Sequence, residues 1–365
     1  MNMPTICFIS NLFPSKSDPT FGSFVENSYQ QLEKMGYYLR PPIVIDGRLK
    51  SVKKLLAYFK FIFSGLCALT LQKNDLYYFH YLTYSTLSLL PVLPFKKVKY
   101  IVNIHGDDLV GARLIHKIMG LPSSYILKHS VKVIVPSNYF KQKVLSLHPH
   151  ISEKKIIISP SSGINSDIFY PKELVQKNDK KIHFGYVSRI DEGKGWQIML
   201  QAISILKTDS PNLYKNLKLS VYGKGNQTKE LTDMINNLNI NETVTYYGAA
   251  QHRDLGAIFR SFDYFLFPTI RESLGLVAIE ALACGTPVIC SDIEPLTEFV
   301  VEGKNGHLFK KNSATQLSKN IEACYSISSD EYHNLANNSI QSVQDFESSK
   351  VMHDLNQNIR NCHLN

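Results

Sequence analysis

Two kinds of segment alternate along the chain. Short apolar runs rich in Ile, Val, Tyr and Phe end at Gly, Pro, Asn or Ser, a pattern typical of buried strands that lead into turns. Longer stretches with helical spacing of apolar residues lie between these runs. In the first half, the apolar runs predict strands at 5–10, 76–81, 99–105, 131–136 and 155–159. Strands separated by helices predict a doubly wound parallel α/β sheet.

The same pattern starts again after the polar stretch YPKELVQKNDKK at 170–181. We interpret residues 171–181 of this stretch as a linker. A chain of 365 residues is long enough for two domains. We therefore predict an N-terminal Rossmann-like domain at 1–170, a second one at 182–340 and a polar helical tail at 341–365. In the second domain we expect strands at 182–187, 217–222, 243–247, 263–267 and 287–290, and helices at 196–207, 228–237, 254–260 and 276–283.

Composition narrows the class of protein. A hydrophobic fraction of 44% excludes a disordered chain. The six cysteines form no CxxC pair and no cluster with zinc spacing, so we interpret most of them as small core residues in a reducing compartment. The first residues show neither a basic segment nor a long apolar one, and we expect no signal peptide and a cytoplasmic location.

The positive charge is unevenly distributed. Residues 1–170 contain 20 Lys and Arg against 9 Asp and Glu, whereas the remainder contains 20 against 22. A basic first half suits an anionic membrane surface, a phosphorylated acceptor or nucleic acid. Nucleic acid is the weakest of these because no DNA- or RNA-binding motif accompanies the charge.

Residues 48–73, RLKSVKKLLAYFKFIFSGLCALTLQK, combine a basic start with a long apolar stretch. The stretch is short for a transmembrane helix and is interrupted by Lys60, Ser64 and Gly65. Two interpretations remain: a core helix with a basic flank, or a helix that lies on a membrane surface.

The candidate binding residues of the second domain follow the ends of its predicted strands. Ligands bind at the carboxyl edge of an open α/β sheet, so these positions suit a binding site. Arg189 and Lys194 lie five apart on a Gly-bearing loop, SRIDEGKGW, and two such cations suit a diphosphate. Glu272 and Glu280, with seven residues between them, flank the start of the helix predicted at 276–283. The free N–H groups at a helix start hold phosphate, so two flanking carboxylates suit the hydroxyls on either side of a diphosphate.

These motifs resemble the retaining glycosyltransferases of the GT-B fold, specifically the large family 4 that uses nucleotide sugars. The most specific part is residues 246–292, where the E-x7-E element runs into EALACGTPVI. GYVSRIDEGKGW at 185–196, PSSGINSDIFYP at 160–171, DPTFGSFV and HGDDL also follow the family pattern. The chain departs from it at Leu274, where Phe or Tyr is common, and at Gly22, which is followed by Ser23 and not by a second glycine.

The resemblance implies a role for each candidate. Glu272 contacts the donor sugar, Glu280 the ribose, and the loop 248–251 flanks the nucleobase. His105 lies near the reacting sugar, and Asp108 fits the acidic position of the His-Gly-x-Asp element. The donor phosphates are implied to meet Gly22, Arg189, Lys194 and the backbone at Leu274, Gly275 and Leu276. The remaining histidines, among them His80, His116 and His252, receive no role.

The implied reaction moves a sugar from a UDP- or GDP-sugar to a saccharide acceptor with retention of configuration. The family pattern implies front-face attack, in which the leaving phosphate takes the acceptor proton, and no DxD motif sits where it would hold a metal. We therefore predict a metal-independent enzyme without a cofactor, with the tail 341–365 crossing back to the first domain. The basic first domain favours a polyprenyl-diphosphate-linked acceptor at the cytoplasmic membrane, as in O-antigen or capsule synthesis.

Two other functions remain open: a nucleotide-sugar epimerase of similar fold, and a GT-B-like binding protein without catalysis. Intact Arg189, Lys194, Glu272 and Glu280 disfavour the second. A dinucleotide oxidoreductase is disfavoured because no GxGxxG follows the first strand.

Overall fold

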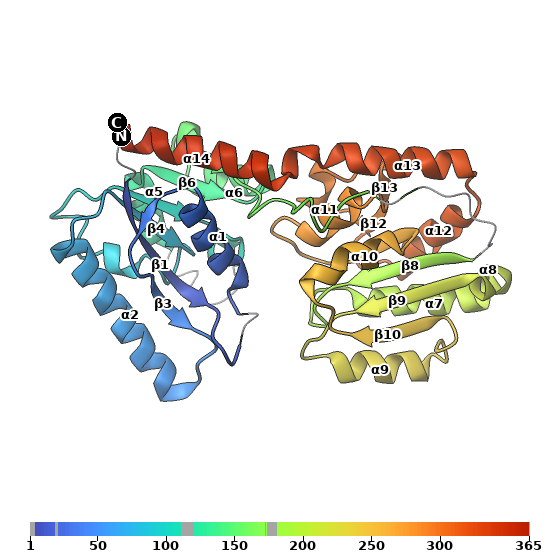
Figure 1. The fold of residues 1–365 in the computed structure, drawn as a ribbon. Coiled ribbons are helices and arrows are strands. Elements are labelled where there is room, and N and C mark those ends of the chain that lie inside the picture. The colour runs from blue at the N-terminus through green and yellow to red at the C-terminus, as the bar shows by residue number, and fades with distance from the viewer. Residues whose placement is uncertain are drawn as a thin grey trace. The chain divides into compact units, whose positions relative to one another are not determined.

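The computed structural model describes residues 4–18, 21–110, 118, 120–171, 173 and 181–364. The chain divides into two compact units, Met1–Gly163 with Ser349–Asn365, and Ile164–Ser348. Each unit is a parallel sheet covered by helices (Figure 1). The division falls seven residues before the boundary expected at 170, and most of the expected linker 171–181 lies outside the described residues.

The first unit is built on a seven-stranded parallel sheet. Its order is β2-β1-β4-β5-β6-β7, with β3 also paired to β1, so the strand order reverses between β1 and β4. The carboxyl ends of these two strands therefore define the ligand-binding edge of this sheet. The strands are β1 Thr5–Phe13, β2 Tyr38–Leu39, β3 Ile43–Asp46, β4 Leu76–His80, β5 Tyr100–Asn103, β6 Lys132–Val135 and β7 Ile156–Ile158.

Alternation along β1 separates the two layers that cover this sheet, because successive side chains of a strand point to opposite faces. Cys7 and Ile9 belong to the cluster that α2 covers with Phe61. Ile6 and Phe8 belong to the other cluster. The described helices are α1 Ser23–Lys34, α2 Ser51–Leu71, α3 Asp107–Val110, α5 Gly120–His129, α6 Asn138–Leu147 and α14 Ser348–Leu364.

The C-terminal helix α14 is part of the first unit, although most of the second unit separates the two in sequence. Leu355, Ile359 and Cys362 are buried in the cluster that contains Ile6 and Phe8. The hydroxyl of Tyr37 also donates to Asn356 Oδ1 at 2.7 Å. The tail thus completes the core of the first unit.

The second unit is a six-stranded parallel sheet of order β10-β9-β8-β11-β12-β13. This is the doubly wound order of a dinucleotide-binding sheet, and its reversal lies between β8 and β11. The strands are β8 Ile182–Val187, β9 Leu217–Tyr222, β10 Val244–Gly248, β11 Tyr264–Phe267, β12 Val288–Ser291 and β13 Gly306–Phe309. The helices are α7 Trp196–Asp209, α8 Pro211–Lys215, α9 Thr228–Asn237, α10 Leu255–Arg260, α11 Leu276–Ala283, α12 Ala314–Tyr325 and α13 Ser329–Ser342.

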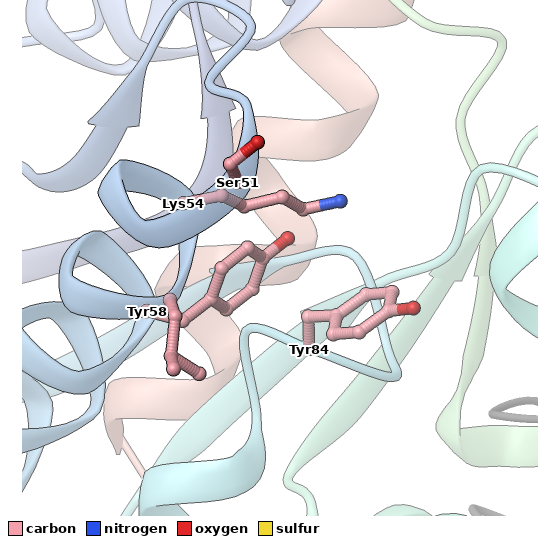
Figure 2. Close-up of a pocket in the computed structure, with 5 residues that line it drawn as sticks. Ser51, Lys54, Tyr58 and Tyr84 are labelled. Carbon is pink, nitrogen blue, oxygen red and sulfur yellow. The ribbon is translucent and has the colours of Figure 1, made fainter.

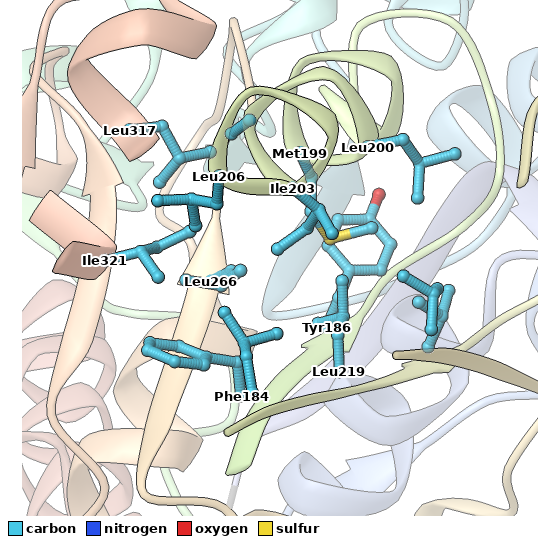
Figure 3. Packing of buried hydrophobic residues seen from close by; sticks show 14 of the residues in the cluster. Phe184, Tyr186, Met199, Leu200, Ile203, Leu206, Leu219, Leu266, Leu317 and Ile321 are labelled. Atoms are coloured by element: carbon cyan, nitrogen blue, oxygen red, sulfur yellow. The ribbon is translucent and has the colours of Figure 1, made fainter. Parts of the chain in front are cut away.

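The core of the second unit fixes the strands that carry its site. Phe184 and Tyr186 of β8 lie beneath Met199 and Ile203 of α7 (Figure 3). Leu317 of α12 and Leu266 of β11 belong to the same cluster. Packing at this density holds the ends of β8 and β11 in fixed register, so the loops that follow them start from fixed points.

Helix α2 has features of both interpretations made from the sequence, the core helix and the membrane-surface helix. Its 21 residues have a mean hydropathy of 1.5 over their most apolar window, which is long and apolar enough to cross a bilayer by length and composition. Only 22% of that window is buried inside the protein. A core helix of a soluble protein meets the same criterion of length and composition, but a fully packed one is mostly buried. One face of the helix therefore belongs to the core of the first unit, and the other face lies on its surface.

Candidate functional site

The strand order of the second sheet brings two of the predicted loops together. β8 and β11 are hydrogen-bonded neighbours, with Phe184 opposite Tyr264. The loop after β8 carries Arg189 and Lys194, and the loop after β11 carries Glu272. Ile270 N donates to Gly193 O at 2.9 Å and ties one loop to the other.

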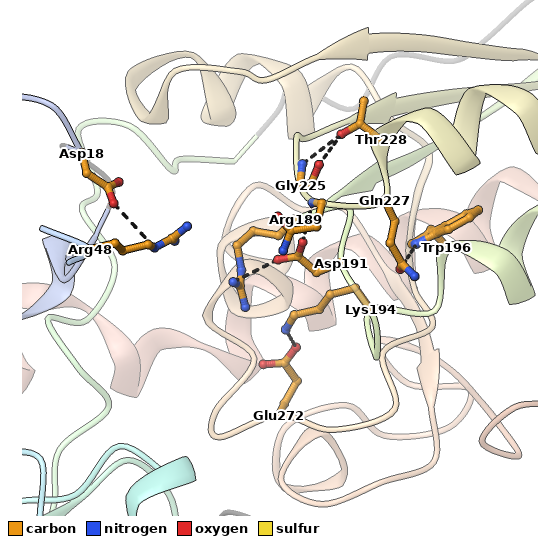
Figure 4. A network of polar contacts seen from close by, with 11 residues as sticks. Asp18, Arg48, Arg189, Asp191, Lys194, Trp196, Gly225, Gln227, Thr228 and Glu272 are labelled. Carbon is orange, nitrogen blue, oxygen red and sulfur yellow. Dashed lines mark hydrogen bonds and ion pairs between the residues drawn. The ribbon is translucent and has the colours of Figure 1, made fainter. Parts of the chain in front are cut away.

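Lys194 and Glu272 form an ion pair at the meeting point of these loops. Lys194 Nζ lies 2.5 Å from Glu272 Oε1, and the two side chains are 19% and 13% exposed (Figure 4). Thr269 Oγ1 is 3.0 Å from the same carboxylate oxygen. The structure therefore places a cation predicted to bind phosphate directly beside a carboxylate predicted to bind sugar.

Arg189 has a different environment. Its guanidinium pairs with Asp191 Oδ2 at 3.1 Å, and its side chain is 67% exposed (Figure 4). Asp191 Oδ1 in turn accepts from the backbone N–H of Asn226 at 2.8 Å. Arg189 is thus anchored to the loop after β9, and an exposed pair of this kind contributes little to stability. Its guanidinium remains accessible to an anionic ligand.

Helix α11 begins immediately after Gly275, at the position expected from the sequence. Gly275 has a φ of 88°, a backbone conformation that residues with a side chain rarely adopt, so this position favours glycine. Leu274, beside it, is buried. No side chain of the described residues caps this helix, so its first N–H groups, from Leu276 onward, are oriented to bind an anion.

Glu280 is buried inside α11 with only 5% exposure, and so is not a residue of a solvated helix face. Burial raises the pKa of its carboxyl, and the nearby His252 opposes that shift. His252 Nε2 lies 3.7 Å from Glu280 Oε1, and the contact with Glu280 raises the pKa of His252. His252 follows directly on the loop 248–251, which links that predicted nucleobase loop to the predicted ribose ligand.

In the first unit, His105 follows β5 and lies edge to edge with His80, at the end of β4, with the two ring planes 15° apart. His80 Nδ1 lies 2.7 Å from His105 Nε2. Burial lowers the pKa of both rings, that of His105 to about 4, so both are neutral at pH 7. A single proton is therefore shared between the two facing nitrogens.

The position of that proton follows from the other nitrogen of His80. His80 Nε2 is buried and has no hydrogen-bond partner among the described residues. A proton on Nε2 would leave a buried N–H unpaired, which is costlier and rarer than an unpaired acceptor. The network therefore assigns the proton to His80 Nδ1, which donates to His105 Nε2. His105 then carries its own proton on Nδ1.

Asp108 fixes the loop that carries His105. Its carboxylate accepts from the backbone N–H groups of His105 and Gly106, each at 2.9 Å, and from that of Leu82 at 2.7 Å. Burial raises the pKa of Asp108 to about 6 despite these bonds. The segments after β4 and β5 are thus joined through one buried carboxyl. Its neighbour Asp107 is exposed and lies in the first turn of α3.

Gly22 has a φ of 72° and precedes α1. A Cβ on it would lie 2.8 Å from the backbone of Leu12 and Phe13, so the loop passes too close to β1 for any side chain. Phe24, in the first turn of α1, packs on the ring of His105 with a centroid distance of 4.8 Å. Gly22 and His105 therefore belong to one neighbourhood of the first unit.

The first unit also contains a hollow of about 270 Å³ at the start of α2. It is lined by Ser51, Lys54, Leu55, Tyr58 and Tyr84. The two tyrosine rings lie 5.5 Å apart, with the amine of Lys54 above them (Figure 2). Aromatic rings beside a cation suit a ligand that carries both a sugar ring and a phosphate.

Several supporting residues were not predicted from the sequence. His80 and His252 received no role, yet each contacts a candidate: His80 contacts His105, and His252 contacts Glu280. His116 lies outside the described residues. The position of His80 at the end of a strand, and that of His252 next to the loop 248–251, could have marked both as candidate site residues. Neither position indicates which residue the histidine contacts.

Solved structures with the same architecture superpose on nearly the whole chain. The sucrose-phosphate synthase of Thermosynechococcus elongatus superposes with a TM-score of 0.77 at 18% identity, covering 98% of each chain. The Anabaena protein HepE in complex with UDP and glucose gives a TM-score of 0.72 at 15% identity, covering 98% of this chain and all of that one. The protein has the GT-B fold, as expected from the sequence.

Residues 171–342 match the family model of Glycosyl transferases group 1. The D-inositol 3-phosphate glycosyltransferase of Arthrobacter sp. (strain FB24) is 31% identical over 147 residues, which are 40% of this chain and 34% of that relative. The chain thus spans about a third of the length of that relative. The matched part of the chain is almost entirely the second unit, which carries Lys194, Glu272 and Glu280.

Proposed function

We propose that this protein is a retaining glycosyltransferase that uses a UDP- or GDP-sugar donor. The observation that carries the proposal is the Lys194–Glu272 pair beside the uncapped start of α11, at the strand-order reversal of the second sheet. Helix N–H groups and two cations complement a diphosphate, and a carboxylate complements sugar hydroxyls. The match of residues 171–342 to Glycosyl transferases group 1 supports the same reaction class.

In this proposal each residue has a role in donor binding or departure. Glu280 accepts from the ribose hydroxyls, and Glu272 accepts from a sugar hydroxyl. Lys194, Arg189, the loop at Gly22 and the backbone at Leu274, Gly275 and Leu276 neutralise the leaving diphosphate. Charge stabilisation of a departing phosphate is typically worth several kcal/mol, about a hundredfold or more in rate.

The acceptor hydroxyl attacks the face from which the diphosphate leaves, and a phosphate oxygen takes its proton. The proposed reaction requires no carboxylate nucleophile, because we assign Glu272, which pairs with Lys194, to binding of the sugar. His105, with its proton on Nδ1, supplies a neutral hydrogen-bond donor from the first unit. The proposed reaction uses no metal and no cofactor.

We place the acceptor on the first unit, where the basic charge is concentrated. The hollow at Lys54, Tyr58 and Tyr84 suits the sugar-phosphate end of a lipid-linked saccharide. A polyprenyl-diphosphate-linked acceptor at the cytoplasmic face of the membrane, in surface polysaccharide synthesis such as O-antigen or capsule, fits these features. Solved proteins of the same fold are described with UDP and sugar, and one is a lipopolysaccharide outer core galactosyltransferase.

A thermal-shift screen of UDP- and GDP-sugars tests the donor, because a bound ligand stabilises the folded state by mass action. We expect one nucleotide sugar to raise the melting temperature of the wild type and not of Lys194→Ala. Incubation of that donor without acceptor then tests the reaction. Slow release of free sugar supports a transferase, whereas formation of an epimeric donor supports an epimerase. Stabilisation without turnover, even with acceptor extracts, supports a binding protein.

A further inference from the structure

One face of α2 is apolar and exposed over more than three turns. Val52, Leu55, Leu56, Phe59 and Phe63 recur at helical spacing, and their exposed fractions lie between 61% and 75%. Scattered exposed apolar residues are ordinary on a protein surface, but a continuous stripe of large ones marks an interaction site.

The opposite face of the same helix is committed to the core of the first unit. Phe61, Ala68 and Leu69 are buried in the cluster beneath the sheet. A Cβ on Gly65 would lie 2.7 Å from Ser88 Oγ, so the helix backbone is pressed against the segment after β4. Because rotation of α2 would break this packing, its exposed stripe cannot turn inward.

The ends of the stripe carry positive charge. No Asp or Glu occurs between Asp46 and Asp75, whereas that interval contains Arg48, Lys50, Lys53, Lys54, Lys60 and Lys73. At the other end of α2, Leu71 is 81% exposed and Phe95 is 90% exposed. Lys96 Nζ donates to Leu69 O at 2.7 Å and so holds Phe95 next to that end, where Lys97 and Lys99 are also exposed.

We propose that α2 lies flat in the surface of an anionic lipid bilayer, with its exposed stripe and Phe95 among the acyl chains and its lysines at the headgroups. A helix with one apolar face and a basic border binds anionic membranes in this way. The helix does not cross the bilayer, because its buried face would have to leave the core of the first unit. The inference rests on the proposed function only in taking the cytoplasmic leaflet as the surface.

The charge pattern distinguishes a bilayer from a second copy of this chain. A symmetric contact between two α2 faces would bring the lysines of each copy close to those of the other, and like charges in a desolvated interface are costly. An anionic leaflet instead supplies negative charge along the whole border. Leu55 belongs both to the stripe and to the wall of the Tyr58–Tyr84 hollow, so the hollow opens beside the headgroups.

The chain contains a single tryptophan, Trp196, which is buried in the second unit, and this makes a depth measurement direct. We expect Phe63→Trp to show a blue-shifted, quenched emission with vesicles of phosphatidylglycerol and brominated lipid, and stronger quenching by bromine near the headgroup end of the chain. Leu147→Trp, on the 48% exposed position of α6, is the matched control and should not be quenched. Vesicles of phosphatidylcholine alone should bind the protein at least about tenfold more weakly.

Two further variants separate the causes. Phe59→Ser with Phe63→Ser should reduce vesicle binding by about tenfold or more without lowering the melting temperature, since both side chains are already exposed. Lys53→Gln with Lys60→Gln should weaken binding and reduce its dependence on salt. The proposal would be overturned if the Phe63→Trp emission were not quenched by brominated lipid, or if quenching were strongest for bromine at the bilayer centre. It would also be overturned if the wild type were a dimer in solution and the serine variant a monomer. The donor-induced thermal shift should persist in every α2 variant, so failure here leaves the proposed function separately testable.

Discussion

The Nδ1 atom of His80 lies 2.7 Å from the Nε2 atom of His105, and the buried His80 ring and the half-buried His105 ring are both neutral at pH 7. This contact fixes the tautomer of the one histidine that the first unit is proposed to offer to the reacting sugar. The same contact makes His80 a positioning residue that acts through its neighbour. Its role can be tested separately from any general effect on folding.

We expect His80→Phe to lower kcat by about tenfold while leaving KM for the donor nearly unchanged, because an aromatic ring is kept while the hydrogen bond to His105 is lost. Nitrogen-15 NMR provides the decisive readout. The wild type should show His105 protonated on Nδ1, and the variant should show a mixture of tautomers. An unchanged His105 spectrum together with reduced activity would assign His80 a purely structural role.

Substitutions of Glu272 and of Glu280 should have different effects on donor binding and turnover. Glu280→Ala should weaken donor binding while turnover at saturating donor is largely kept, because the ribose is remote from the reacting bond. Glu272→Ala should also lower kcat by about a hundredfold, since it removes a sugar contact and leaves Lys194 without its partner. Calorimetry gives donor Kd and steady-state kinetics give kcat. Glu230→Ala, at an exposed position of α9, is the control, and equal small effects from both glutamates would contradict the division of roles.

Donor binding should weaken in acid as Glu280 becomes protonated, and His252 should set where this happens. The pKa of Glu280 is raised by burial, and His252 opposes the shift, so His252→Gln should raise that pKa further. The acid limb of donor affinity should therefore move to higher pH in the variant. Donor Kd measured from pH 5 to pH 8 checks this, with the exposed neighbour Arg253→Gln as control. Identical pH profiles would remove His252 from the site.

Asp108→Ala should destabilise the first unit by about 2–4 kcal/mol, because three backbone N–H groups, two of them in buried hydrogen bonds, lose their acceptor. The effect should be larger at pH 4 than at pH 8. The pKa of Asp108 is raised to about 6 in the folded protein, so the stability that this carboxyl contributes is full below its ordinary pKa and declines as the pH rises through 6. Hydrogen exchange of the segments 76–82 and 100–108 measures both results. A pH-independent loss would place the effect elsewhere.

Local patterning was sufficient to predict five of the six strands of the second unit, but not its helices α8, α12 and α13. The strands at Ile182–Val187 and Leu217–Tyr222 and the helices at Thr228–Asn237 and Leu276–Ala283 have the predicted bounds. Strong apolar runs with clear turn residues explain this success. β13 at Gly306–Phe309 and β3 at Ile43–Asp46 were not predicted, because both are short and at the margins of their sheets.

Contacts between distant segments could not be predicted in this way. The motif predicted Lys194 and Glu272 as separate ligands, and their ion pair depends on the adjacency of β8 and β11. His80 is 25 positions from His105, and only the pairing of β4 with β5 brings them together. Retention of configuration, metal independence and the roles of the candidate residues stay predictions.

The helix α14 gives the folding of this chain an unusual order. Ile6 and Phe8 lie in β1, which precedes the second unit in the chain, yet the face they form is closed by Leu355 and Ile359, which follow that unit. The first unit therefore begins to form before the second and is completed after it. A ribosome that stalls just after Ser348 leaves a chain whose second unit is complete but whose basic half exposes an open apolar face. Quality-control proteases should cleave that half first, and the second unit, complete by Ser348, should outlast it.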